Sequence, residues 1–342
     1  MAAGRDIVQS EIPVTKTKGI QLWVNLSSKD KKIAPSYQDL KFSRIPIATP
    51  DSGVEVKPEG VGATVRRCIS ARNAIDPFLM CDLFEVSPPA GFPDHPHRGF
   101  ETVTYMLEGT TAHEDFEGNK GLIGPGDVQW MTAGRGIIHS EMPVTTTKGI
   151  QLWVNLSSKD KKIAPSYQDL KSSQIPIATP DSGVEVKVIA GTSHGVTSKI
   201  FTRTPTMLMD FKLSKGKSVV QDIPTDFQGF IFVLEGSGYF GGNSFKGNEN
   251  HALYFENNGG DHINVEAKDE DVRFMLIAGK PLGEPIESYG PFVMNTKEEI
   301  AQTRFDFMNY TNGFEKARGW HSTIGYGVSN IDFTNFETKA KK

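Results

Sequence analysis

Cysteine is scarce in this 342-residue sequence, in which Cys68 and Cys81 are the only two. Two cysteines cannot build the disulfide framework of a small secreted fold, so we expect a reducing compartment. No apolar run approaches the ~20 residues of a membrane-spanning helix. The opening MAAGRDIVQSEIPV also lacks the basic start and apolar stretch of a secretory leader. With 37 Lys and Arg against 41 Asp and Glu, the chain has no basic field for nucleic-acid phosphates, and we expect any role at DNA to be indirect.

An internal copy occupies the start of the chain, which is long enough for about two domains. Residues 1–57 align without gaps to residues 131–187, with 49 of 57 positions identical. This identity indicates a recent partial duplication or a misassembled gene rather than a structural repeat. Gln9 stands where the parent has His139, so we expect residues 1–57 to add nothing to a metal site and to be extra or loosely attached. Alternatively, their KGIQLWVNL competes with Lys148–Leu156 for one place in a sheet.

Short apolar and β-branched segments recur from Glu59 onward at intervals of about 10–15 residues, separated by Gly, Pro, Asp and Asn. This spacing is typical of an antiparallel sandwich or barrel. The sequence YMLEG at Tyr105–Gly109 is matched by FVLEG at Phe232–Gly236, which indicates an older duplication. We therefore predict an all-β fold with two similar barrels in tandem.

The predicted division of the chain follows from these segments. We place a first, metal-binding barrel at residues 58–189, a second, degenerate barrel at 190–325 and a polar tail at 326–342. Helical patterning appears mainly in NTKEEIAQTRFDFMNYTNGF, where Thr296 could cap a helix and Glu299 could reach back to its start.

Histidines at alternate positions point to a metal site in the first barrel. His95 and His97 lie two residues apart in FPDHPHRGF, and His139 lies two residues before Glu141 in GIIHSEMP. In a strand, residues i and i+2 project to the same face, so two adjacent strands could offer three imidazoles and a carboxylate to one ion. Such mixed ligation suits non-haem Fe(II), with Mn, Ni, Cu or Zn also compatible. His113, in AHEDF, we interpret as a polar residue at the barrel rim.

The stretches FPDHPHRGFETVTYMLEG, AHEDFEGNKGLIGPGDVQWMTAGRGIIHSEMP and KGIQLWVNL closely resemble the pirins, members of the cupin superfamily, and the resemblance extends from about Glu59 to His321. It implies tandem double-stranded β-helix (cupin) barrels with a short helical tail, and one mononuclear iron in the first barrel. The implied ligands are the same His95, His97, His139 and Glu141. The copied segment replaces the usual lead into the first barrel, which places its first strand in question.

The resemblance also assigns a role to Glu101. In cupins generally, a glutamate at this spacing is a ligand, whereas in pirins it neighbours the site. We expect Glu101 to orient a histidine or a bound water. In the second barrel, Asp222 and Pro224 stand where the first has its His-x-His pair, so we expect no second iron there.

Aromatic side chains near the histidine motifs suggest where a ligand could bind. Phe100, Trp130, Met131 and Trp153 could line a pocket for a flat aromatic molecule above the metal. The alternative interpretation, favoured for each residue singly, is ordinary barrel core, because aromatic residues on strands usually pack inward.

Two functions are compatible with these observations. The resemblance implies a quercetin 2,3-dioxygenase, in which Fe(II) holds a flavonol and O2 together and ring opening releases carbon monoxide and a depside. Glu141 could accept the proton of the 3-hydroxyl if it loosens from the metal. It equally implies a redox-sensitive co-regulator in nucleus and cytoplasm that binds a transcription factor or a G-protein alpha subunit and does no catalysis. Storage, known for other bicupins, fits the ligand set poorly.

Overall fold

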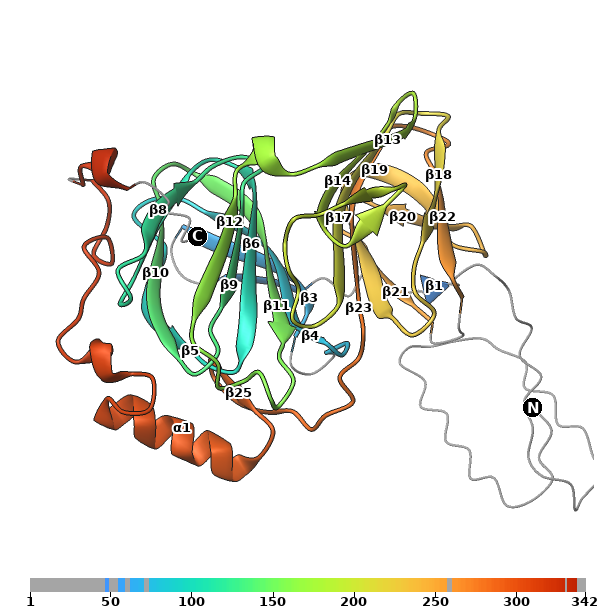
Figure 1. The fold of residues 1–342 in the computed structure, drawn as a ribbon. Helices are drawn as coiled ribbons and strands as arrows, with labels where there is room; N and C mark the ends of the chain where they lie inside the picture. The colour runs from blue at the N-terminus through green and yellow to red at the C-terminus, as the bar shows by residue number, and fades with distance from the viewer. Residues whose placement is uncertain are drawn as a thin grey trace, which may run out of the picture.

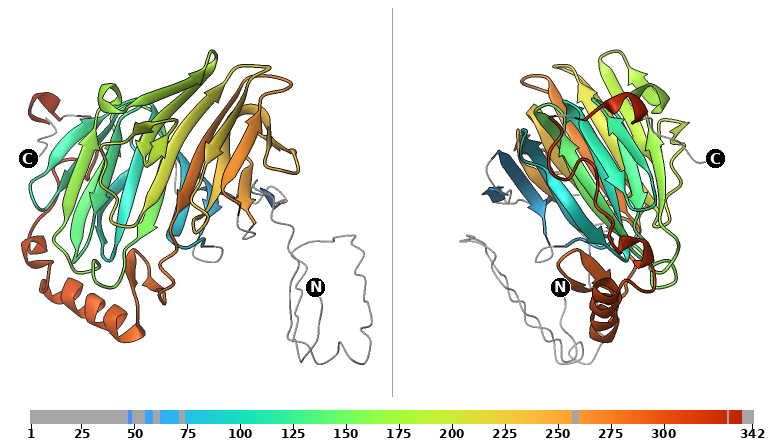
Figure 2. Two further views of the ribbon diagram at one scale, coloured as in Figure 1. Left: turned by 45° about the vertical axis from the view of Figure 1, so that its right-hand side comes forward. Right: turned by 90° about the vertical axis from the view of Figure 1, so that its left-hand side faces the viewer.

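The computed structural model describes residues 47–48, 55–58, 62–70, 74–256, 260–329 and 331–336. In this part of the chain, β-strands dominate and form two barrels that lie side by side (Figure 1 and Figure 2). No helix within these ranges has the length and apolar character needed to cross a membrane. The predicted all-β fold with tandem barrels is confirmed.

The first barrel consists of a seven-stranded and a four-stranded antiparallel sheet. Their orders are β12-β9-β6-β11-β4-β3-β2 and β5-β10-β7-β8. The strands are β2 (Glu55–Pro58), β3 (Ala63–Ile69), β4 (Phe78–Val86), β5 (Phe92–His97), β6 (Phe100–Glu108), β7 (Thr111–Asp115), β8 (Lys120–Ile123), β9 (Val128–Thr132), β10 (Ile137–Pro143), β11 (Thr147–Asn155) and β12 (Ser166–Leu170). Because alternate residues of a strand face opposite sides, one set of side chains from each strand points into the barrel.

The second barrel is built on a sheet of order β1-β21-β19-β23-β17-β14-β13, with β18, β20 and β22 paired off this path. These strands are β1 (Ile47–Ala48), β13 (Ile177–Asp181), β14 (Val184–Ala190), β17 (Thr206–Leu213), β18 (Ser218–Asp222), β19 (Gln228–Phe240), β20 (Phe245–Asn248), β21 (Ala252–Phe255), β22 (His262–Glu266) and β23 (Val272–Gly279); β15 (Thr192–Ser193) and β16 (Val196–Thr197) form a small hairpin. Its interior is a continuous apolar cluster, in which Phe211 and Phe274 stack with ring centroids 4.8 Å apart.

A shared apolar layer joins the two barrels. Phe78 and Trp130 of the first barrel belong to the same buried cluster as Phe230 of the second, and the Phe78 and Phe230 rings meet edge to face at 6.0 Å. Polar contacts also cross this layer: the Tyr105 hydroxyl donates to Asp210 at 2.7 Å, and the Tyr254 hydroxyl donates to the Cys68 carbonyl at 2.6 Å. The barrels therefore share a core and do not merely touch.

The C-terminal region returns to the first barrel. After the hairpin β24 (Glu287–Tyr289) and β25 (Phe292–Met294), helix α1 (Lys297–Asn309) runs beneath the first barrel (Figure 1). The predicted helix start is confirmed, because the Thr296 side chain accepts a hydrogen bond from the Glu299 backbone N–H. Short 3₁₀ turns are η2 (Ser172–Gln174), η3 (Glu315–Ala317) and η4 (Phe333–Asn335).

This return differs from the predicted division, which assigned residues 190–325 to the second barrel. Phe292 and Phe314 pack in one buried cluster with Met131 and Ile137 of the first barrel. The order of segments along the chain does not reveal which barrel the C-terminal region will pack against. The packing of Phe292 and Phe314 on the first barrel therefore determines where the second barrel ends along the chain.

Only the end of the copied segment falls within the described residues. Ile47–Ala48 pairs with β21 at the edge of the second barrel, and Glu55–Pro58 pairs with β3 in the first. The parent strand β11 occupies the place between β4 and β6. The copied KGIQLWVNL lies outside the described residues, so its predicted competition for that place stays a prediction.

Candidate metal centre

Three histidines from two neighbouring strands meet inside the first barrel. His95 and His97 come from β5, and His139 of β10 stands directly opposite His95 in the antiparallel register. One ring nitrogen from each of the three can be chosen so that all lie within 4.8 Å of one another. The strand alternation used in the sequence argument thus brings these imidazoles together as predicted.

The local sequence shapes the approach of the histidine strand. β5 is an edge strand, where Pro93 and Pro96 are tolerated because an edge does not need every backbone N–H for pairing. Gly99 lies in the turn between β5 and β6, and its φ of +90° and its contact with the Val293 carbonyl leave no room for a side chain. Buried Lys161 fixes this turn by donating to the Gly99 carbonyl at 2.9 Å.

Burial keeps the three imidazoles neutral. His97 and His139 are 3% and 1% exposed, and burial lowers the pKa of each well below its ordinary value, as nearby imidazole charge does further. Burial also lowers the pKa of His95, whose Nδ1 lies 2.7 Å from the Pro93 carbonyl and whose Nε2 is thereby left for other contacts. Neutral imidazoles are the form that binds metal ions.

Several ring nitrogens also have a lone pair that no hydrogen bond within the protein uses, as a metal ligand requires. His97 Nδ1 and both nitrogens of His139 are buried and have no hydrogen-bond partner within the protein. Buried polar atoms seldom remain unpaired, and nitrogen donors from three imidazoles suit Fe, Zn, Cu and Ni. The cluster therefore fits a divalent transition metal.

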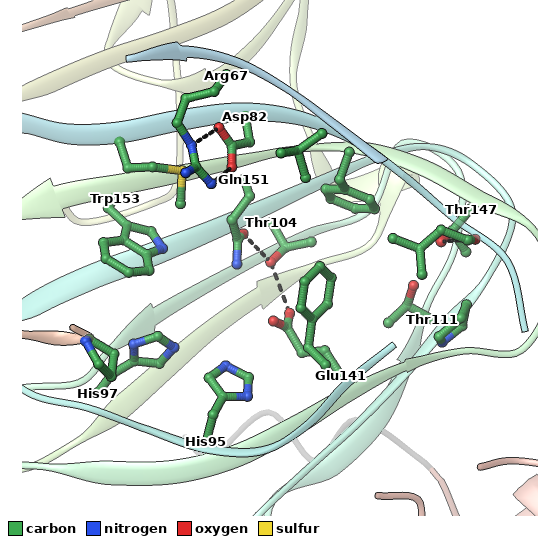
Figure 3. Close-up of a pocket in the computed structure, with 17 residues that line it drawn as sticks. Arg67, Asp82, His95, His97, Thr104, Thr111, Glu141, Thr147, Gln151 and Trp153 are labelled. Atoms are coloured by element: carbon green, nitrogen blue, oxygen red, sulfur yellow. Dashed lines mark hydrogen bonds and ion pairs between the residues drawn. The ribbon is translucent and has the colours of Figure 1, made fainter. Parts of the chain in front are cut away.

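Glu141 lies beside this cluster without being part of it. Its carboxylate lines the same cavity as His95 and His97 and accepts a hydrogen bond from the Thr104 hydroxyl at 3.1 Å (Figure 3). Burial raises the pKa of Glu141 to about 7, against the opposing effect of the Thr104 hydrogen bond. Glu141, the predicted fourth ligand and base, thus lies next to the histidines. It belongs to β10, whose pairing with β5 shifts register between His139 and Glu141.

Glu101 departs from the prediction. Glu101 lies on the same face of β6 as Val103 and Tyr105, which belong to the shared core between the barrels. Its carboxylate accepts a hydrogen bond from Thr132 at 2.6 Å. The predicted spacing assumed an unbroken strand from His97. The turn at Gly99 separates β5 from β6, so the alternation does not carry across it, and Glu101 points away from the histidines.

The cavity in front of the histidines measures about 230 Å³. Its walls are Val65, Arg67, Met80, Asp82, Phe84, Val86, Phe92, His95, His97, Thr104, Thr111, Glu141, Pro143, Thr147, Gln151, Trp153 and Pro291. Eight of these seventeen residues are apolar, and the Trp153 ring meets His97 edge to face with centroids 5.4 Å apart. A flat aromatic molecule would find aromatic and aliphatic side chains here, with the imidazoles of His95 and His97 at one side (Figure 3).

Three of the four aromatic and sulfur side chains expected around this pocket do not line it. Trp130 packs in the core between the barrels, and Met131 packs against the C-terminal region. Phe100 lies behind the site, where its ring contacts His97 and Trp153. Of the four, only Trp153 reaches the cavity among the described residues. The sequence alone could not show which strand face points inward, and the alternative interpretation of core packing applies to the other three.

Comparisons with known proteins decide the family. The family model described as pirin matches residues 61–154, and that of the pirin C-terminal cupin domain matches residues 208–313. Pirin-like protein 2 of Arabidopsis thaliana is 53% identical over 276 residues, which cover 78% of this chain and 86% of the relative. Human pirin is 51% identical over 275 residues, or 78% and 94% of the two chains. The chain belongs to the pirin family.

A solved structure also resembles this pirin closely. It is the quercetin 2,3-dioxygenase from Acinetobacter baumannii, with a TM-score of 0.70 and 34% sequence identity over 76% of this chain and 95% of the other. The resemblance extends over both barrels, and it agrees with the predicted cupin architecture.

Sequence reasoning missed several polar residues that this pirin places around the cavity. Thr104 and Gln151 stand opposite each other on β6 and β11, and Arg67 pairs with Asp82 through two hydrogen bonds of 2.9 and 2.6 Å. Two of them interrupt an otherwise apolar run, Gln151 in GIQLWVNL and Asp82 in FLMCDLFEV. A lone polar residue at an inward position of a strand is the signal that could have found them.

His113 is buried, not at the rim as predicted. It is 1% exposed, stands opposite Glu141 in the register of β7 and β10, and stacks on the Tyr167 ring at 6.1 Å. Burial lowers the pKa of His113 to about 3, and its Nε2 has no partner within the protein. The neighbouring acids in AHEDF suggested solvent exposure, but they occupy other positions along β7.

Proposed function

We propose that this pirin is a quercetin 2,3-dioxygenase that uses one Fe(II) held by His95, His97, His139 and Glu141. The observation that carries the proposal is a cluster of three neutral imidazoles, of which His97 and His139 are buried and His95 is partly buried, next to a cavity that His95 and His97 line together with eight apolar residues. The likeness to a solved quercetin 2,3-dioxygenase supports it. The flavonol and O2 are the proposed substrates, and other divalent transition metals are alternatives to iron.

The residues of the cavity have distinct parts in this reaction. Trp153, Phe84 and Phe92 would hold the flat ring system and exclude water, which strengthens polar contacts at the metal. Glu141 would accept the proton of the flavonol 3-hydroxyl when it loosens from the metal, and burial raises its pKa to about 7 in the metal-free protein. Bound Fe(II) supplies the redox chemistry that allows dioxygen to react with the organic substrate.

The proposal is tested by loading the purified protein with Fe(II) and following quercetin absorbance and carbon monoxide release. We expect turnover by the wild type, and a loss of about 100-fold or more in His97→Ala and in Glu141→Gln. His97→Ala should also lose bound iron. His262→Ala, in the second barrel, is the matched control and should retain both iron and activity.

An iron-replete wild-type sample that leaves quercetin unchanged would contradict the proposed activity. In that case the second function from the sequence, a redox-sensitive co-regulator, would be examined by comparing partner binding of the Fe(II) and Fe(III) forms. Its expected place in nucleus and cytoplasm stays a prediction.

A further inference from the structure

Strand β11 presents two side chains with unused N–H donors to the cavity. Gln151 and Trp153 lie two residues apart on this strand, so their side chains project from the same face, and both line the cavity. Within the residues that the structure describes, the Gln151 side chain is hydrogen-bonded only through its oxygen, and the Trp153 indole N–H has no partner. Because protein N–H groups that leave water are normally paired, these two donors point to an acceptor that a ligand supplies.

Thr104 holds the Gln151 amide in one orientation. The Thr104 hydroxyl donates to Gln151 Oε1 at 2.7 Å, and its contact with Glu141 Oε1 is longer, at 3.1 Å. With its oxygen held by Thr104, the amide must direct its nitrogen, and the two hydrogens that this nitrogen carries, elsewhere. Figure 3 shows the amide nitrogen directed into the cavity and the indole nitrogen of Trp153 on the side of its ring that faces Gln151.

The position of these donors indicates which group of a ligand they would bind. The Trp153 ring meets the His97 ring with centroids 5.4 Å apart, so the two N–H donors lie on the part of the wall that is next to the histidines. In a flavonol, the carbonyl oxygen at C4 is adjacent to the 3-hydroxyl, which is the proposed metal-binding group. This carbonyl oxygen carries no hydrogen and can only accept, as two N–H donors require.

We propose that Gln151 and Trp153 form a two-donor site for the carbonyl oxygen of a planar aromatic ligand and determine specificity for it. This rests on the proposed function and deepens it. The ligand class is an aromatic ring system with a carbonyl beside the oxygen that binds the metal. A ring system without this carbonyl binds less tightly, because it covers the two donors and gives them no acceptor.

Both donors are held in place before a ligand binds. Thr104 holds the amide, and the Trp153 ring packs against the Phe100 ring, with centroids 4.5 Å apart, as well as against His97. Side chains that are already fixed lose little conformational freedom on binding. The amide and indole N–H groups are uncharged and do not titrate near neutral pH. The preference that they cause should therefore be the same at pH 6 and pH 8.

The test compares two ligands that differ in one acceptor atom. 3-Hydroxyflavone and its 4-thione share one ring system, but the thione has sulfur, a weak acceptor, in place of the carbonyl oxygen. Full-length protein loaded with Zn(II), which has no redox chemistry, is titrated with each by calorimetry. The ratio of the two Kd values measures the preference for oxygen. We expect this ratio to be about three- to tenfold larger in the wild type than in Gln151→Met, the range of one net hydrogen bond.

A second variant and a matched control accompany this comparison. Trp153→Phe removes the indole N–H, retains an aromatic ring and should reduce the ratio by a similar factor. All variants carry the same metal, so any difference in how Zn(II) binds the two compounds cancels. Gln168→Met, on β12 and outside the cavity, should keep the wild-type ratio. Circular dichroism and zinc content verify folding and loading, and Gln151→Leu replaces Gln151→Met if the latter does not fold.

Two results would overturn the inference and leave the proposed dioxygenase standing. One is a wild-type ratio in both Gln151→Met and Trp153→Phe; the other is an equal reduction in Gln151→Met and Gln168→Met, which would show that the effect does not come from the cavity. By contrast, a zinc-loaded wild type that binds neither compound would refute the proposed function and this inference together.

Discussion

Asp169 is a partly buried acid whose protonation makes the stability of the first barrel depend on pH. It stands on β12 opposite Gln129, and its Oδ1 has no hydrogen-bond partner within the protein. Burial raises the pKa of Asp169 to about 7, although the charge of Lys171 opposes this. Because the pKa of the folded state exceeds the ordinary value of about 4, the folded protein holds this proton more tightly than the unfolded chain. Stability is therefore lost as the pH rises towards 7.

We predict that Asp169→Asn removes this loss. A pKa difference of about 3 units corresponds to at most about 4 kcal/mol. Because Asp169 is only partly buried and solvent screens its charge, the variant should gain about 2 kcal/mol in free energy of unfolding relative to the wild type between about pH 4 and pH 8, since Asn has no proton to release. Urea unfolding at several pH values measures the difference. Asp226→Asn is the control, since its exposed carboxylate pairs with Lys280 and should show no such gain. A difference between Asp169→Asn and wild type that stays constant with pH would contradict the prediction.

At the scale of elements, helix α1 is tied to the strand that carries two histidines. Arg98, the residue after His97, donates to Asp306 of α1 at 2.8 Å, and the two side chains are only 6% and 3% exposed. Arg98 also donates to the carbonyls of Arg135 and Asn312, at 2.6 and 2.7 Å. A buried ion pair whose remaining donors are hydrogen-bonded holds its two side chains in a fixed position. Removing one partner leaves a buried charge unpaired, which lowers the free energy of unfolding. The helix thus helps to fix the position of His97.

Asp306→Asn should lower the free energy of unfolding by about 3 kcal/mol or more, because the buried Arg98 charge loses its counter-charge. Bound metal should also dissociate faster, since β5 is less firmly held. The control is Lys162→Ala, which breaks an exposed ion pair with Glu299 of the same helix and should cost less than about 0.5 kcal/mol. Chemical denaturation and metal-release kinetics measure both effects. Equal stability of Asp306→Asn and wild type would contradict this role for α1.

The sequence was most informative where a rule acts within one element. The His95, His97 and His139 cluster follows from strand alternation, and the helix start at Thr296 follows from local capping. Both depend on neighbours a few residues apart. The strands themselves were recognisable for the same reason, because period-two patterning and Gly or Pro turns are local signals.

Errors arose where the outcome depends on contacts between distant elements. Glu101 was misplaced because Gly99 ends one strand and starts another, which changes the face that follows. His113 was misplaced because its burial depends on Tyr167, more than fifty residues away along the chain. The cavity wall combines β3, β4, β5, β6, β7, β10 and β11, so its composition could be known only after the sheets were assembled.

At the scale of the whole molecule, nearly identical segments take different partners. In the parent, β13 and β14 pair with each other, with Ile177 opposite Lys187. The corresponding residues of the copy, Ile47 and Lys57, lie in β1 and β2, which pair with the second and the first barrel respectively. The pairing of an edge strand is thus set by the free edge that it meets and not by its sequence alone.

This difference leads to a prediction from two truncations. Every described residue of the cavity and the metal cluster lies at Val65 or beyond, so deleting residues 1–46 should leave metal content and flavonol binding unchanged.

Deleting residues 1–60 also removes β2 and exposes the edge of β3, which carries Val65 and Arg67 of the cavity wall. We expect this longer truncation to unfold at lower temperature and to aggregate more readily, because an open strand edge invites pairing with other chains. Calorimetry, light scattering and metal analysis compare the two. Loss of metal from the shorter truncation would show that the copied segment contributes to the site.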